Sequence, residues 1–163
     1  MSVEGDTNRG RRATGRPVSR SILIDRPAHE VAQQFGDVDH HERSDLHTGT
    51  RFHVLEQDDD FCEYEQHSRV GLIKIRQQFH LDRSDRFHQV NTVTGGNLNG
   101  GTLVFDIVES GLGSAEVTAT LTPPNTFLIR LAGPILRQAI DRSLAAALEE
   151  DRADLESGRY AAG

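Results

Sequence analysis

The chain has 163 residues, enough for one domain that buries roughly two-thirds of its unfolded surface. Hydrophobic residues make up 36% of it and charged residues 26%, which is typical of globular proteins and excludes a largely disordered chain. Cys62 is the only cysteine, so a disulfide framework and a CxxC metal or redox motif are excluded as well.

The net charge of −7 is unevenly distributed. Residues 1–20 hold five arginines and two acids, which leaves 13 basic and 23 acidic residues, a net charge of −10, on residues 21–163. A body this acidic repels nucleic acid and anionic membranes. We expect no nucleic-acid partner, no membrane span and a cytoplasmic location, since the start of the chain lacks the apolar run of a signal peptide.

Three segments open the chain. Residues 1–17 are rich in glycine, arginine and polar residues without periodicity, which predicts a disordered basic tail. A first strand is predicted over VSRSILID from Val18. The next stretch, RPAHEVAQQF, has Pro27 in a first-turn position and apolar residues on one face, which predicts a short amphipathic helix that ends at Gly36.

Residues 40–47 read HHERSDLH, a concentration of titratable side chains in an otherwise ordinary acidic chain. One interpretation is a solvated or substrate-facing loop, because histidines beside acids and an arginine find partners in water. The other is a metal site. The sequence leaves both interpretations open.

From Thr50 to Thr122 the hydrophobic period changes to two, and turn signals separate runs of about ten residues. Six consecutive strands without an intervening helix predict an antiparallel meander. The stretch TGGNLNGG within it lacks the lysine and hydroxyl residue of a phosphate loop, and a turn between strands explains it.

Alternation along these strands assigns one face to the interior. The predicted inward residues are Phe52, Val54, Cys62, Tyr64, Gln66, Ile73, Ile75, Gln77, Phe79, Leu103, Phe105, Ile107, Val117, Ala119 and Leu121. The predicted outward residues carry mixed charges and are His53, Glu63, Glu65, His67, Lys74, Arg76 and His80. The run FHQVNTV is ambiguous, and His88 faces inward if Val90 and Thr92 do.

After Pro123 the pattern changes again, and a long helix is predicted from Pro134 to about Ser157. Its predicted inward residues are Ile135, Leu136, Ile140, Leu144, Leu148 and Leu155. Asp151 lies three residues after Leu148 and four before Leu155, so this acid falls on the apolar stripe.

This order of elements resembles the helix-grip fold of START domains, birch-pollen-type allergens and polyketide cyclase/dehydrase-like proteins. The stretches that carry the likeness are SRSILIDRPAHEVAQQFGDV and LAGPILRQAIDRSLAAALEEDRADLESGRY. The resemblance implies an α+β domain over residues 18–160. In it, a curved antiparallel sheet of about seven strands wraps around the long C-terminal helix, and two short helices follow the first strand.

The resemblance also implies a ligand cavity between sheet and helix. The leading interpretation is a protein that binds an apolar or aromatic small molecule, as a polyketide cyclase/dehydrase-like enzyme, a lyase or isomerase, in which Tyr64 or His88 moves a proton. One alternative is a non-catalytic lipid or quinone carrier. The oligomeric state stays open, a homodimer included.

Twelve residues are predicted to line the cavity and contact the ligand, because mostly apolar walls with few polar groups suit such a site. They are Phe52, Val54, Cys62, Tyr64, Gln66, Ile75, Gln77, Phe79, Phe105, Ile107, Ile140 and Leu144.

The third interpretation is a non-haem metal-dependent enzyme, an oxygenase for example, that uses the histidine stretch. In a helix-grip fold this stretch lies near the C-terminal half of the long helix, so His40, His41 and His47 can approach Asp151. Two imidazoles and one carboxylate bind iron(II) or zinc and leave coordination positions open. The leading interpretation requires no cofactor, and this one requires a divalent metal held by His41, His47 and Asp151, with His40 as a substitute ligand.

Overall fold

The computed structural model describes residues 15–70, 73–126, 129–130 and 133–160. Its strands are β1 (Val18–Ile24), β2 (Thr50–Gln57), β3 (Phe61–Val70), β4 (Ile73–Asp82), β5 (His88–Gly96), β6 (Thr102–Glu109) and β7 (Ala115–Thr122). Its helices include α1 (Ala28–Gly36), α2 (Val38–Ser44) and the long α4 (Gly133–Glu156).

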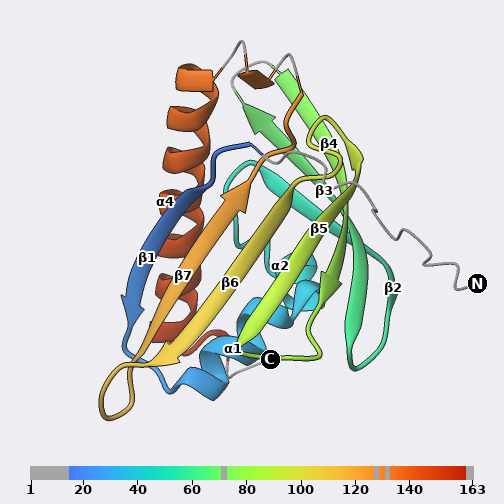
Figure 1. Ribbon diagram of the computed structural model, residues 1–163. Helices are drawn as coiled ribbons and strands as arrows, with labels where there is room; N and C mark the ends of the chain where they lie inside the picture. Colours follow the sequence, from blue (N-terminus) through green and yellow to red (C-terminus); the bar gives the residue numbers. More distant parts are fainter. Residues whose placement is uncertain (1–14, 71–72, 127–128, 131–132, 161–163) are drawn as a thin grey trace, which may run out of the picture.

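The seven strands form one antiparallel sheet in the order β1-β7-β6-β5-β4-β3-β2. From β2 to β7 each strand pairs with the next one along the chain, which confirms the predicted meander. Strand β1 pairs with β7, so the first and last strands of the chain lie side by side (Figure 1). The chain therefore has the predicted α+β helix-grip architecture, with two short helices after the first strand.

Two polar residues shape the ends of α2. The Asp37 carboxylate caps the helix by accepting a hydrogen bond from the backbone N–H of His40 at 2.9 Å. Asp45 ends it with left-handed backbone angles (φ 46°), a conformation that aspartate tolerates better than most residues. As a result His40 and His41 lie on a helix, and only His47 lies in the connection to β2.

The buried apolar residues form two separate clusters. The first, called here the helix cluster, joins α4 and α1 to β1, β6 and β7 through residues such as Ile24, Phe35, Ile107, Val117 and Leu148. The second, the α2 cluster, joins Val38 of α2 to strands β3, β4 and β5 and contains Cys62, Tyr64, Phe79, Leu81 and Val93. Helix α4 thus packs on the β1 half of the sheet, beside β1 in Figure 1.

The turn between β5 and β6 depends on glycine. Gly96 has a φ of +92°, and a Cβ atom there would lie 2.3 Å from the carbonyl oxygen of Arg76 on β4. The backbone N–H of Gly101 donates to the carbonyl of Leu98 at 2.8 Å and closes the turn. This confirms a turn between strands for TGGNLNGG.

Most predicted faces are confirmed. Glu65, expected outside, is only 8% exposed, because its carboxylate accepts hydrogen bonds from Arg76 and Gln78 on β4. Ile135, expected inside, is 80% exposed on the first turn of α4. Strand β5 has the opposite phase to the one that would bury His88, because Gln89, Asn91 and Val93 are buried and His88 is exposed.

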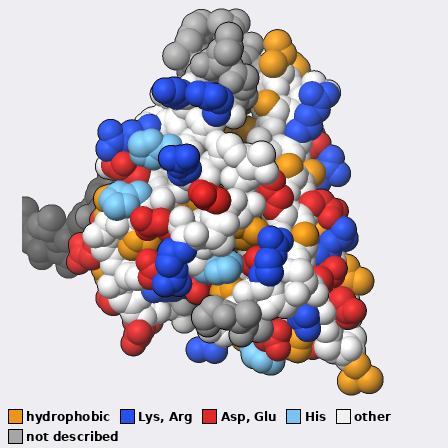
Figure 2. Space-filling view, turned by 180° about the vertical axis from the view of Figure 1, so that it is seen from behind, with side chains coloured by type: hydrophobic (Ala, Val, Ile, Leu, Met, Phe, Trp, Pro, Cys, Tyr) orange, Lys and Arg blue, Asp and Glu red, His pale blue; other side chains and the backbone are white. Residues whose placement is uncertain are grey.

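The predicted tail over residues 1–17 lies mostly outside the described residues, as does Gly71, one of the turn signals that separate the predicted strands. Within the described residues, no helix is long and apolar enough to span a membrane. Figure 2 shows charged side chains of both signs interspersed over the face seen from behind, with small hydrophobic patches between them.

Candidate functional site

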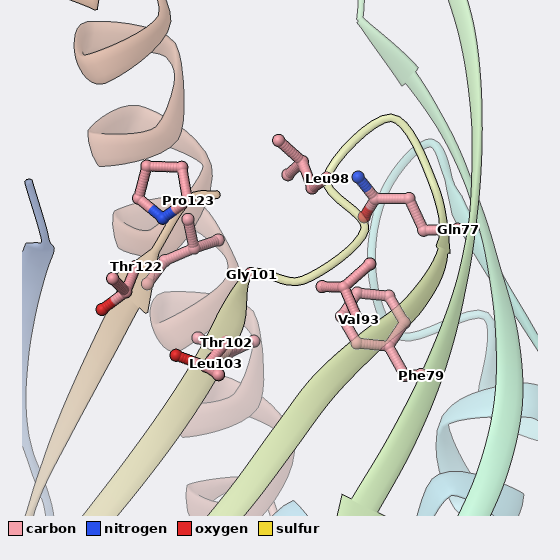
Figure 3. A pocket seen from close by; sticks show the side chains of 10 residues that line it. Gln77, Phe79, Val93, Leu98, Gly101, Thr102, Leu103, Thr122 and Pro123 are labelled. Carbon is pink, nitrogen blue, oxygen red and sulfur yellow. The ribbon is translucent and has the colours of Figure 1, made fainter. Parts of the chain in front are cut away.

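An apolar pocket lies at the seam between the two core clusters (Figure 3). One wall comes from Gln77, Phe79, Val93 and Leu98, on the side of the α2 cluster. The other wall includes Leu103 and Leu121, which pack against the helix cluster, together with Gly101, Thr102, Thr122 and Pro123. The pocket has a volume of about 20 Å³, which is room for about one water molecule.

Gln77 contributes a side-chain amide to the lining of this pocket. Its side chain is buried and points into the pocket toward Leu98 (Figure 3). A buried amide surrounded by apolar walls can fix the orientation of a ligand through one or two hydrogen bonds.

Tyr64 lies behind the pocket. Its ring stacks on that of Phe79 with a centroid distance of 5.1 Å, and its hydroxyl donates to Oδ1 of Asn91 at 2.9 Å. Burial raises the pKa of the Tyr64 hydroxyl. The hydroxyl therefore keeps its proton, and its hydrogen bond is directed at Asn91 rather than into the pocket.

His88 does not face the pocket, so the structure does not place it as a catalytic residue there. Its side chain is 53% exposed and its Nδ1 lies 2.6 Å from a carboxylate oxygen of Asp106. The hydrogen bond to Asp106 raises the pKa of His88 against a small loss from burial. The strand phase that turns His88 outward instead buries Gln89, which donates to the carbonyls of Ala32 and Arg86 at 2.7 and 2.9 Å.

Of the twelve predicted ligand contacts, only Gln77 and Phe79 line the pocket in this structure. The others are divided between the two clusters or lie at their edges: Phe52, Val54, Cys62 and Tyr64 belong to the α2 cluster, and Phe105, Ile107, Ile140 and Leu144 to the helix cluster. Gln66 and Ile75 are half-buried. The sequence missed Val93 and Leu98, the second of which lies in the turn that alternation does not cover.

A second site is polar and joins α2 to α4. His41 Nε2 and His47 Nε2 lie 3.2 and 3.5 Å from Oδ1 of Asp151. The side chains of His41 and His47 are only 8% and 10% exposed, and Asp151 is buried. The interpretation of the histidine stretch as a solvated loop is therefore wrong for these two residues.

The Asp151 carboxylate favours the protonated form of His41. Burial lowers the pKa of His41, but the hydrogen bond and the charge of Asp151, together with Asp37, outweigh it and leave the pKa above its ordinary value. A third group, the side-chain amide of Gln34, donates to the same Asp151 oxygen at 3.1 Å.

His40 is not a member of this group. Its Nε2 lies 2.8 Å from Oδ2 of the buried Asp154, and its ring contacts that of Tyr160 edge-on. The sequence missed Gln34 and Asp154, although Gln34 lies three residues after Val31 on the apolar face of α1, a spacing that could have identified it.

Comparisons with known proteins give structural likeness without sequence likeness. No protein-family model matches the chain, and none of the curated proteins matches it significantly. The Zhui aromatase/cyclase from Streptomyces sp. R1128 has a TM-score of 0.74 and 16% identity, over 91% of this chain and 98% of that one.

Two further structures are similar. TTHA0849 from Thermus thermophilus has a TM-score of 0.78 and 12% identity, over 88% of this chain and 99% of that one. A START superfamily protein from Mycobacterium smegmatis has a TM-score of 0.65 and 16% identity, over 86% of this chain and 99% of that one. The chain therefore has the helix-grip fold that these START-like and aromatase/cyclase structures share.

Proposed function

We propose that the protein binds and carries an apolar or aromatic small molecule on its sheet, at the seam between the two core clusters. The observation that carries the proposal is the seam pocket, whose walls come from both core clusters. A ligand at this position would replace apolar contacts between the clusters with its own, at little loss of buried apolar surface.

The size of the pocket sets the condition for binding. Ligand sites for drug-sized molecules measure roughly 300–1,000 Å³, far more than the 20 Å³ at the seam. Binding therefore requires the two clusters to separate. The apolar residues of α4 belong to the helix cluster alone, so the separation leaves the packing of α4 on β1 intact.

The chemistry of the walls favours carriage over catalysis at this pocket. None of its described lining residues has an ionisable side chain, and general acid–base catalysis needs such a group within hydrogen-bonding distance of the reacting atom. A cyclase-like reaction, as the name of the Streptomyces structure suggests, is the second candidate. It would need Tyr64 to leave Asn91 when the pocket opens.

The proposal is tested by titrating the protein with an apolar fluorescent dye that brightens in apolar surroundings. Leu98→Ala removes part of the pocket wall, and we expect it to weaken binding by about tenfold, the effect of about 1.4 kcal/mol of lost apolar contact. The matched control is Leu112→Ala, because Leu112 is fully exposed in the turn between β6 and β7.

Equal affinity in the wild type, Leu98→Ala and Leu112→Ala would place the dye elsewhere and overturn the proposed pocket. Carriage and catalysis are then separated by Tyr64→Phe. Carriage predicts unchanged dye affinity within about twofold, whereas loss of turnover of an identified ligand in that variant would favour the cyclase-like alternative.

A further inference from the structure

Three hydrogen-bond acceptors converge between α2 and α4. The ligand atoms of His41, His47 and Asp151 all lie within 4.8 Å of one another. The two imidazole Nε2 atoms approach one carboxylate oxygen, at 3.2 and 3.5 Å. The three residues come from different elements: His41 from α2, His47 from the connection between α2 and β2, and Asp151 from the last third of α4.

The other ring nitrogen of each histidine shows which nitrogen carries the proton. Nδ1 of His41 lies 2.7 Å from the backbone carbonyl of Asp37, and Nδ1 of His47 lies 3.0 Å from a carboxylate oxygen of Glu150. Carbonyl and carboxylate oxygens accept hydrogen bonds, so each Nδ1 carries a hydrogen. In the neutral imidazoles both Nε2 lone pairs then point at the Asp151 oxygen.

Lone pairs facing a carboxylate repel one another unless a cation lies between them. Protons on both Nε2 atoms would make two imidazolium rings, and these rings stack at 20° with centroids 5.3 Å apart, so their like charges would repel in a buried place. A proton on Nε2 of His41 alone would leave the Nε2 lone pair of His47 facing the Asp151 oxygen at 3.5 Å, whereas a single metal ion would satisfy all three groups at once.

The distances suit such an ion. Ligand atoms about 2.1 Å from one metal and 90–110° apart are separated by about 3.0–3.4 Å. The Nε2 atoms of His41 and His47 lie 3.2 and 3.5 Å from Oδ1 of Asp151, close to this range. The hydrogen bonds from Nδ1 to Asp37 and Glu150, and from Gln34 to Asp151, are of the kind that orient metal ligands from outside the coordination shell.

We infer that His41, His47 and Asp151 bind one divalent transition-metal ion of the zinc or iron(II) class through Nε2, Nε2 and Oδ1. Three protein ligands leave coordination positions open for water or a substrate oxygen. Phe52, whose ring centroid lies 5.6 Å from those of both histidines, gives the site an apolar wall that continues to Tyr64. The site is separate from the seam pocket and does not depend on ligand binding there.

The test uses the full chain with any histidine tag removed and metal stripped by a chelator. Zinc is titrated in competition with a chromophoric chelator, and cobalt(II) is added separately to record its visible ligand-field bands. We expect one equivalent of metal per chain. His47→Gln and Asp151→Asn should each lower the affinity by more than the tenfold to 100-fold that loss of an outer partner costs, and Glu150→Gln by about tenfold.

Matched controls carry the same substitutions outside the site. His67→Gln changes an exposed histidine of β3, and Asp141→Asn changes an aspartate of α4 that pairs with Arg20. Both should bind zinc like the wild type. Circular dichroism and thermal unfolding identify variants that fail to fold, and His47→Gln is the decisive variant because His47 lies nearest the surface of the three.

Less than about a tenth of an equivalent of zinc in the wild type would overturn the inference. So would equal zinc affinity and equal cobalt bands in wild type and folded His47→Gln, since the metal would then be bound by surface histidines. The inference is supported if His47→Gln and Asp151→Asn lose zinc binding and the cobalt bands while the control variants keep zinc binding and the cobalt bands.

Discussion

At the scale of single residues, burial decides which reactive groups can act. Cys62 has no exposed surface, and burial raises its pKa from the ordinary value of 9.0 to about 11. Alternation along β3 predicts its inward position, and nothing in its surroundings lowers the pKa enough to make it a nucleophile.

We predict that Cys62 resists thiol reagents in the folded protein. The raised pKa alone lowers the thiolate fraction at pH 8 by about 100-fold, and lack of access slows the reaction further. The rate of reaction with a chromogenic disulfide, with and without denaturant, checks this. Equal rates in both conditions would show that the thiol is accessible in the native state.

The hydrogen bond between Tyr64 and Asn91 is the second prediction at this scale. Tyr64→Phe leaves the buried Asn91 oxygen without its donor, so we expect the free energy of unfolding to fall by about 1–3 kcal/mol. Urea unfolding measures it. A matched control is Phe61→Leu at the start of the same strand, a half-buried position without such a bond, and an equal loss there would refute the assignment.

At the scale of elements, hydrophobic periodicity was a reliable guide to strands β2 to β7 and to the length of α4. It left the inward face of β5 ambiguous, because Gln89 and Asn91 are buried there with partners on α1 and β3. A period-two pattern assigns polar residues to the solvent face. It carries no information about a hydrogen-bond partner that is distant in sequence and that would allow a polar residue to be buried. For the same reason it could not predict that Gln34 holds Asp151.

Helix α4 offers a matched pair of aliphatic truncations. Leu148 is 3% exposed inside the helix cluster, and Leu148→Ala should lower the free energy of unfolding by about 2–5 kcal/mol. Ile135 is 80% exposed, and Ile135→Ala should change it by no more than about 0.5 kcal/mol. Similar losses from both variants in thermal or urea unfolding would mean that the first turn of α4 is packed.

At the scale of the whole molecule, the sequence predicted where three titratable residues would meet but not how they are held. The approach of His41 and His47 to Asp151 followed from the resemblance to helix-grip proteins, together with the place of Asp151 on the apolar stripe. The orienting partners Asp37 and Glu150 emerge only once α2 and α4 are packed together.

The division of the core into two clusters was not predictable either. The sequence assigns residues to an inward face, and it does not say which inward residues touch one another. The structure places α4 over the β1 half of the sheet and α2 over the other half, and the seam pocket is lined by strand and turn residues from both halves. The proposed ligand site depends on that seam.

The most direct measurement is a methyl NMR titration of the full chain with an apolar probe molecule. We predict the largest shifts at the methyl groups of Val93, Leu98, Leu103 and Leu121, which face the seam from both clusters, and small shifts at exposed Leu112 and Ile135. Shifts confined to Leu112, Ile135 or other exposed methyl groups, with the four seam residues unchanged at saturation, would contradict the account.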